Sequence, residues 1–195
     1  MSIFWIWLTG LVFALLHSLP ATTGMKKYMH RRGIGMQAYR LAYSILALIL
    51  TSLWLLFVYA LPDSPLYHLT GWIHASLVAL QLAGLGVVLL SFRAFDAAIF
   101  LGLRPMPDEG EPFHETGIYR LVRHPMYSGF ILVLLASPIQ TVNSLNLALV
   151  ICLYFVIGSV FEERRMLAER PAYTDYRQRV GAFIPKFRHK NNTVD

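Results

Sequence analysis

Long apolar segments, separated by shorter polar ones, dominate the amino-acid sequence. Three of them cover residues 3–19, 39–61 and 72–92, and a longer apolar stretch runs from residue 125 to residue 161. A helix needs about 20 predominantly apolar residues to cross the hydrocarbon core of a bilayer. The first three segments reach or approach that length, so each of them predicts one membrane-spanning helix.

The stretch from residue 125 to residue 161 is too long for a single span. A helix of about 37 residues would extend about 55 Å, whereas the hydrocarbon core is about 30 Å thick. The polar sequence QTVNS at residues 140–144 interrupts this stretch near its middle. We therefore expect two short helices in a tight hairpin, over residues 125–140 and 144–163.

Together these patterns predict an all-α, polytopic integral membrane protein with about five transmembrane helices. A single membrane domain covers residues 1–195 and ends in a polar C-terminal tail, residues 164–195. The composition agrees, because 56% of the residues are hydrophobic, whereas soluble domains are about 45–50% apolar. Cys152 is the only cysteine, which excludes an intrachain disulfide and a CxxC redox pair. The sequence also lacks a metal-ligand motif such as HExxH, so we expect no metal site.

The distribution of lysine and arginine predicts the orientation. The loop after the first span contains Lys26, Lys27, Arg31 and Arg32, whereas the connections at residues 62–71 and 140–143 contain no lysine or arginine. The loop at residues 93–124 and the tail are again basic. Since cytoplasmic loops carry the excess of these residues, we expect a multi-pass protein of a bacterial-type cell membrane, with the N-terminus outside and the C-terminus in the cytoplasm. The net charge of +6 therefore indicates the bilayer as partner and no nucleic acid.

A basic sequence stands where the fourth predicted span begins. Pro125 suits the first position of a helix, and Arg123 and His124 directly precede it. The free N–H groups at a helix start attract anions, so this point predicts a site for a carboxylate or phosphate on the cytoplasmic side. Gly117 and Gly129 would allow a ligand or a neighbouring helix to approach closely. The alternative is an ordinary basic flank of a membrane span.

Two further groups of residues are candidates for chemistry. Glu162, Glu163 and Arg164 stand at the end of the last span, where a carboxylate is costly unless it is paired or solvated. They either bind a ligand or form charge pairs along a helix that continues into the cytoplasm. His17 lies late in the first span, where a histidine is a functional candidate, although it could also bridge two helices.

These motifs carry a resemblance to a known group of enzymes. The sequence GIYRLVRHPMYSG at residues 117–129, followed by EER at residues 162–164, resembles the isoprenylcysteine carboxyl methyltransferase superfamily of membrane methyltransferases. Tyr173, Tyr176 and the sequence IPK at residues 184–186 extend the likeness. The first half, with LHS at residues 16–18 and FLGLR at residues 100–104, resembles the bacterial methanethiol S-methyltransferases and related membrane proteins found with denitrification genes.

The resemblance implies a pocket for S-adenosylmethionine near the cytoplasmic face. Arg123 and His124 would anchor the methionine carboxylate, and either Glu162 or Glu163 would meet the ammonium or the ribose. The cofactor-binding residues that it implies are Gly117, Ile118, Tyr119, Arg123, His124, Pro125, Tyr127, Gly129, Glu162 and Glu163. The catalytic candidates are Arg164, Glu163 and His17.

The hypothesis that follows is methyl transfer from S-adenosylmethionine to a small or lipophilic thiol. A thiol must react as its thiolate, which Arg164 or a protonated His17 would favour. Within the same class, the alternatives are carboxyl methylation of an isoprenylcysteine-like or other lipophilic acid, and N-methylation of a lipid amine. An alternative from a different functional class is a non-catalytic membrane accessory or transport protein linked to nitrogen-oxide metabolism.

Overall fold

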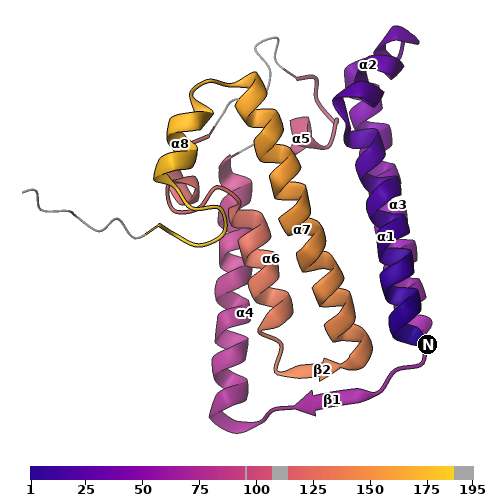
Figure 1. Cartoon of the computed structure of the whole chain (residues 1–195), viewed down its shortest axis with the longest axis vertical. Coiled ribbons are helices and arrows are strands. Elements are labelled where there is room, and N and C mark those ends of the chain that lie inside the picture. The colour runs from indigo at the N-terminus through magenta and orange to yellow at the C-terminus, as the bar shows by residue number, and fades with distance from the viewer. Residues whose placement is uncertain (95, 107–113, 187–195) are drawn as a thin grey trace, which may run out of the picture.

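The computed structural model describes residues 1–94, 96–106 and 114–186. Helices dominate this part of the chain, which confirms the all-α class (Figure 1). The acidic sequence PDEGE at residues 107–111 and the tail beyond residue 186 lie outside the described residues. In chain order the elements are α1 (Ser2–Ala21), α2 (Thr23–Arg31), α3 (Met36–Ala60), β1 (Pro65–His68), α4 (Gly71–Ser91), η1 (Phe92–Ala94), α5 (Ala97–Phe100), η2 (Gly117–Arg120), α6 (Pro125–Leu135), β2 (Ile139–Thr141), α7 (Val142–Glu169) and α8 (Tyr173–Arg179).

Four helices are long and apolar enough to cross a membrane. They are α1 with 20 residues, α3 with 25, α4 continued by η1 with 24, and α7 with 28. Their outward faces expose large apolar side chains, as at Leu15, Leu48 and Leu56, each more than 60% exposed. Such a surface is unfavourable in water and normal against lipid, so the protein is a polytopic membrane protein.

The predicted hairpin of two short helices differs from the structure in the lengths of its helices. Helix α6 has only 11 residues, about 16 Å, which is well short of a bilayer core. Helix α7 is the long one, because Thr141 and Ser144 form a capping box at its start and its last turns extend into the charged sequence as far as Glu169. The polar sequence at residues 140–144 contains the end of β2 and this capping box.

A small sheet closes the end of the bundle where the N-terminus lies (Figure 1). Strands β1 and β2 pair antiparallel, with Pro65 opposite Thr141 and His68 opposite Ile139. Asp63 strengthens this connection, since its Oδ1 accepts hydrogen bonds from the backbone N–H groups of Ser64 at 2.8 Å and Asn143 at 2.9 Å. The end of α3 is thereby joined to the start of α7.

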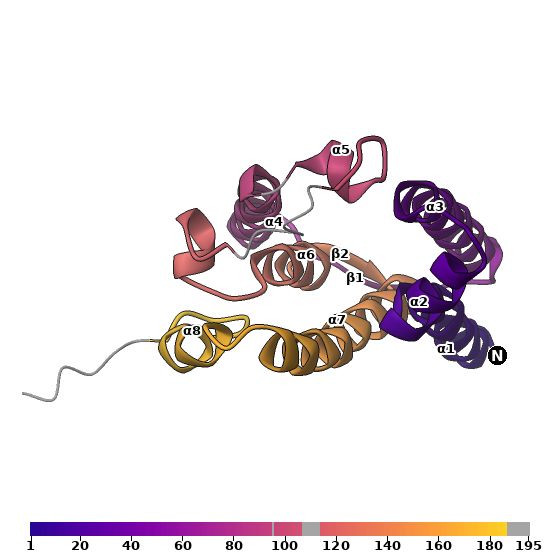
Figure 2. The same cartoon turned by 90° about the horizontal axis from the view of Figure 1, so that it is seen from above.

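Two packing contacts hold the long helices together. Ile6, Trp54, Val58 and Val150 form a buried cluster between α1, α3 and α7. On the other side of the bundle, α4 and α6 run side by side in both views (Figures 1 and 2). Gly129 makes their close approach possible, because a Cβ there would lie 2.6 Å from the Gly84 carbonyl oxygen.

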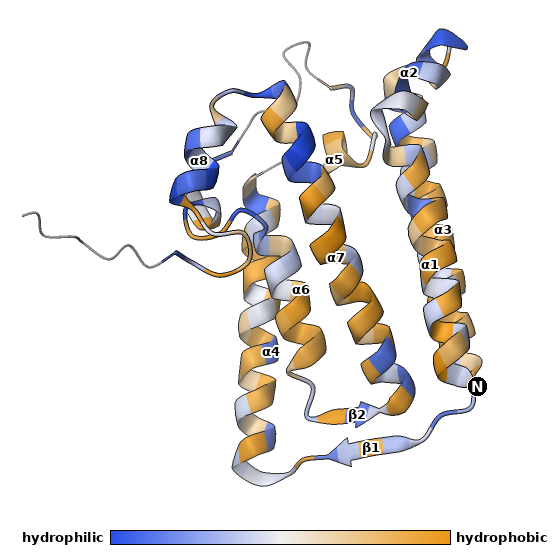
Figure 3. Cartoon of the chain, in the orientation of Figure 1, coloured by the Kyte–Doolittle hydropathy of each residue, from blue (hydrophilic) through white to orange (hydrophobic). Residues whose placement is uncertain are grey.

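Polar and charged residues gather at the opposite end of the bundle from the sheet. They lie on α2, on the last turns of α7 and on α8, while the middle of the helices is mostly apolar (Figure 3). The residues expected to bind a cofactor, at the start of α6 and the end of α7, also lie at this end (Figure 1).

Candidate active site

Glu163 is the centre of an ionic cluster at the charged end. Its Oε1 accepts hydrogen bonds from Arg123 Nε at 2.8 Å and Arg123 Nη2 at 2.6 Å. His124 Nε2 lies 3.1 Å from the same oxygen, and Arg177 Nε donates to Oε2 at 3.0 Å. The side chains of Arg123 and Glu163 are only 8% and 10% exposed. Protein groups therefore occupy both carboxylate oxygens of Glu163.

The C-terminal segment after α8 completes this cluster. The backbone N–H groups of Arg123 and His124 donate to the carbonyl oxygens of Gly181 (2.8 Å) and Ala182 (2.9 Å). Arg123 Nη1 donates to the Val180 carbonyl as well. Gly181 has no room for a side chain, since a Cβ would collide with the Ile184 carbonyl. The start of α6 is thus held between the end of α7 and the last described residues of the chain.

Aromatic rings line the other side of His124. The imidazole stacks on the Tyr127 ring with 5.5 Å between centroids, and Tyr127 stacks on Phe155 of α7 at 4.8 Å. The Tyr127 hydroxyl donates to Glu162 Oε2 at 3.3 Å, and His124 Nδ1 lies 3.8 Å from the same oxygen. The two adjacent glutamates therefore have different surroundings, because Glu163 is enclosed by cations whereas the Glu162 side chain is 42% exposed.

A small polar pocket opens in front of Glu162. It is lined by Tyr119, Arg123, His124, Pro125, Met126, Tyr127 and Glu162. The backbone N–H groups of Met126 and Tyr127, in the first turn of α6, have no hydrogen-bond partner among the residues that the structure describes. Burial, and then the charge of Glu162, raise the pKa of the Tyr119 hydroxyl. The pocket therefore places one carboxylate beside two free donors at the positive end of a helix.

The chemistry of these groups fits the amino-acid end of S-adenosylmethionine. A ligand with a carboxylate and an ammonium finds donors at the start of α6 for the first group and Glu162 for the second. The described residues contain no group of three His, Cys, Asp or Glu side chains that could hold a metal ion.

Several predicted site residues lie outside the pocket lining. Gly129 packs against α4, and Gly117, with φ of +58°, forms the start of η2. Ile118 is half-buried in the same turn. Arg164 is exposed, with its guanidinium 5.8 Å from the centroid of the Phe161 ring. His17 lies on α1, where its Nδ1 is 2.9 Å from the Tyr154 hydroxyl.

Sequence reasoning missed three residues that hold the cluster together. Arg177 pairs with Glu163, Gly181 accepts from Arg123, and Phe155 stacks on Tyr127. Arg177 and Gly181 lie in a polar tail without periodicity, and Phe155 is one aromatic residue within a long apolar run. Tyr176, which the motif did include, donates to the Tyr119 carbonyl at 2.6 Å and so docks α8 onto η2.

The fold and the pocket define a multi-pass membrane protein with a polar pocket at one end of a helical bundle. The sequence profile of the NnrU protein family matches residues 5–187. The chain belongs to the NnrU family.

Named relatives cover most of the chain. It is 29% identical to methanethiol S-methyltransferase 2 of Bradyrhizobium diazoefficiens, over 94% of this chain and 73% of that protein. It is 31% identical to the methanethiol S-methyltransferase of Mycobacterium tuberculosis, over 89% of this chain and 74% of that protein. No solved structure matches the chain.

Proposed function

We propose that this protein is a membrane methyltransferase that moves a methyl group from S-adenosylmethionine to a small or lipophilic thiol. The relatives named as methanethiol S-methyltransferases support methyl transfer to sulfur. The donor site is proposed from one observation: Glu162 lines a pocket together with Met126 and Tyr127, whose backbone N–H groups have no partner among the described residues.

In this proposal, Glu162 binds the ammonium of the donor, and the N–H groups of Met126 and Tyr127 bind its carboxylate. Tyr119 and Tyr127 form walls of the pocket. Arg123 and Glu163 act as positioning residues, because they form an ion pair with each other and Arg123 also donates to the Val180 carbonyl of the C-terminal segment. His124 stands between the two glutamates and holds its ring parallel to that of Tyr127.

The donor supplies an activated methyl group on a sulfonium, so the protein has little covalent chemistry to perform. Its residues must orient the acceptor in line with the methyl group and exclude water, and such positioning supplies a large part of the rate enhancement. Arg164 lies beside Phe161, which lines a groove between α1 and α7. From there its charge would favour an anionic acceptor.

The charged end of the bundle is the cytoplasmic end in this proposal. The basic residues of α2 and α8 lie there, as does the polar pocket. Cytoplasmic loops of membrane proteins carry the excess of lysine and arginine, and this is the side on which a soluble donor is available.

Binding and product analysis on the purified protein test the proposal. We expect heat on titration with S-adenosylhomocysteine, and a mass increase of one methyl group on a thiol when S-adenosylmethionine is supplied. The acceptor panel should include lipophilic carboxylates and lipid amines, because methylation of one of those would replace the thiol. A protein that binds neither form of the donor is not a methyltransferase.

A further inference from the structure

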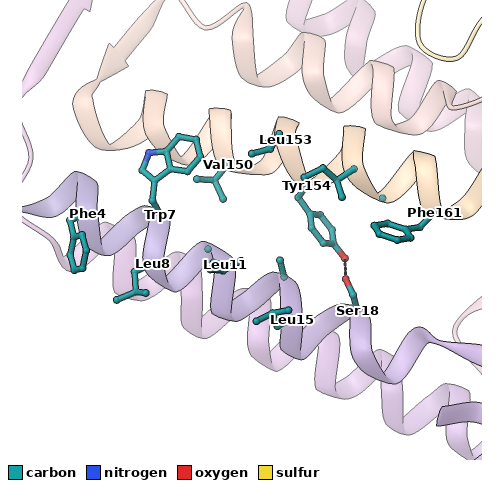
Figure 4. A pocket seen from close by; sticks show the side chains of 14 residues that line it. Phe4, Trp7, Leu8, Leu11, Leu15, Ser18, Val150, Leu153, Tyr154 and Phe161 are labelled. Atoms are coloured by element: carbon teal, nitrogen blue, oxygen red, sulfur yellow. Dashed lines mark hydrogen bonds between the residues drawn. The ribbon is translucent and has the colours of Figure 1, made fainter. Parts of the chain in front are cut away.

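A second polar cluster lies within the apolar part of the bundle. His17 Nδ1 of α1 is 2.9 Å from the Tyr154 hydroxyl of α7 and 3.4 Å from the Tyr43 hydroxyl of α3. Ser18 Oγ is 3.1 Å from the Tyr154 hydroxyl (Figure 4). Helix α1 has no other ionisable side chain. An ionisable residue inside a membrane span is costly and usually serves a function.

The hydrogen bonds leave one nitrogen of the His17 ring available. Nδ1 faces both tyrosine hydroxyls, whereas Nε2 has no partner among the described residues. The Tyr43 hydroxyl donates to the His17 carbonyl at 3.3 Å, and the Tyr154 hydroxyl is within donating distance of Ser18 Oγ. In the tautomer with the proton on Nδ1, the ring donates to the Tyr154 hydroxyl, which can donate in turn to Ser18 Oγ. The lone pair of Nε2 is left as a base whose orientation is fixed by its neighbours.

This cluster is adjacent to the proposed donor pocket. Phe155 follows Tyr154 on α7 and stacks on Tyr127, whose hydroxyl donates to Glu162. The rings of Tyr154 and Phe155 also lie 6.3 Å apart, measured between their centroids. A molecule bound at His17 would therefore lie near Tyr127, a residue that lines the donor pocket.

A groove between α1 and α7 reaches the same cluster from the apolar outer face of the bundle (Figure 4). Its volume is about 650 Å³, and its walls are almost entirely apolar, with side chains such as Leu11, Leu15 and Leu153. Ser18 and Tyr154 are the hydroxyl groups in its lining. A neutral molecule dissolved in the membrane can follow this surface, whereas a charged one would lose its hydration on the way.

We propose that the His17–Tyr43–Tyr154 cluster binds the methyl acceptor as a neutral, membrane-soluble thiol, with His17 as its general base. This inference rests on the proposed methyltransferase function. His17 Nε2 takes the proton of the thiol, and the thiolate sulfur forms a bond to the methyl carbon while the bond from that carbon to the donor sulfonium breaks. The products are a methyl thioether and S-adenosylhomocysteine, and the proton passes from His17 to water. A carboxylate acceptor would need no such base, because it is already ionised.

The kinetic test compares acceptors of different acidity. For an alkanethiol, His17→Gln should lower the rate about 100-fold or more, which is the range of general base catalysis. For an arenethiol that is already largely thiolate at neutral pH, the same variant should lose far less. Tyr154→Phe should cause a smaller loss of rate, again larger for the alkanethiol than for the arenethiol. This variant keeps the His17 base but removes the hydroxyl that orients its ring. His74→Gln, on α4 near the opposite end, is the matched control. Equal losses for both thiols would show that His17 only supports the fold.

A second measurement needs no methyl donor. In protein containing isotope-labelled histidine, titration with ethanethiol should shift the His17 nitrogen resonance, which the His17→Gln variant identifies. If S-adenosylhomocysteine binds but this resonance does not move, the acceptor site is wrong and the methyltransferase function stands. If the resonance moves but the protein neither binds S-adenosylhomocysteine nor transfers a methyl group, the thiol site stands and the methyltransferase function is wrong.

Discussion

Arg123 donates through both Nε and Nη2 to a single carboxylate oxygen of Glu163, at 2.8 and 2.6 Å. The two side chains are almost fully buried, and Arg123 also donates to the carbonyl oxygens of Arg177 and Val180. The sequence suggested that Arg123 anchors the carboxylate of a ligand. In the structure its partners are groups of the protein, so its contribution is to hold the pocket in shape.

Replacement of Arg123 should therefore destabilise the protein. Arg123→Ala leaves the carboxylate of Glu163 buried with fewer partners, and losing one member of a buried pair costs about 3–5 kcal/mol. The loss should appear as a lower unfolding temperature in detergent. The double variant Arg123→Ala with Glu163→Gln should recover part of that loss, because it removes the uncompensated charge. An unchanged unfolding temperature for Arg123→Ala would contradict the structural role.

Glu162 should affect binding instead of stability. Glu162→Gln keeps the shape of the side chain but removes the charge that we propose for the donor ammonium, and hydrogen bonds to charged groups contribute about 1.5–3 kcal/mol. Affinity for S-adenosylhomocysteine, measured by calorimetry, should fall roughly tenfold or more. Glu169→Gln, at the exposed end of the same helix, is the control and should bind normally. Equal effects of both variants would rule out a specific role for Glu162.

The contact between α4 and α6 should tolerate no side chain at Gly129. A Cβ there would lie 2.6 Å from the Gly84 carbonyl oxygen and 2.7 Å from a Val88 methyl carbon. Overpacking of this kind typically costs about 1–3 kcal/mol, so Gly129→Ala should lower the unfolding temperature. Gly86→Ala is the matched control, since a Cβ at Gly86 meets nothing within 4 Å. If the two variants unfold at the same temperature, the helices are farther apart than described.

High pH should detach α8 from the rest of the site. Tyr176 is only 2% exposed, and burial raises the pKa of its hydroxyl well above the usual range. Burial also raises the pKa of Tyr173 to about 12. Because the folded-state pKa exceeds the unfolded value of about 10, the stability from these groups is complete below that pH and is lost as the pH rises through the folded values.

Tyrosinate absorbance and limited proteolysis between residues 170 and 186 can follow this transition together. Tyr176→Phe loses the hydrogen bond to the Tyr119 carbonyl, which is worth about 1 kcal/mol. The variant should be less stable at neutral pH and less sensitive to alkali. A native protein in which these tyrosines ionise without any increase in cleavage would show that α8 does not depend on them.

The sequence predicted the class of fold because the apolar runs are long and unambiguous. It also predicted that the start of the helix at Pro125 and the Glu162–Glu163 pair would lie at the same end of the bundle, where the structure has them. Which glutamate faces the pocket was not predictable. Adjacent residues on a helix point about 100° apart, and the rotation of α7 depends on its packing against the rest of the bundle.

Other features had no local signal. Strands β1 and β2 have only four and three residues, and one of them begins with a proline, so they resemble loops in the sequence. Gly181 is one glycine in a polar tail, and its role depends on its pairing beside Val122. The partners of Arg123 also depend on this distant segment, so the charge of the residue was predictable and its role was not.

The pairing of Val122 with Gly181 also sets the order in which the protein matures during synthesis. All of the long helices precede Gly181 in the chain and can enter the membrane before it leaves the ribosome. Until then, the N–H groups of Arg123 and His124 lack the carbonyl oxygens that they meet in the finished protein. A nascent chain is thus inserted before its ligand pocket can take shape, and a chain that stops short of this residue would be embedded but incomplete.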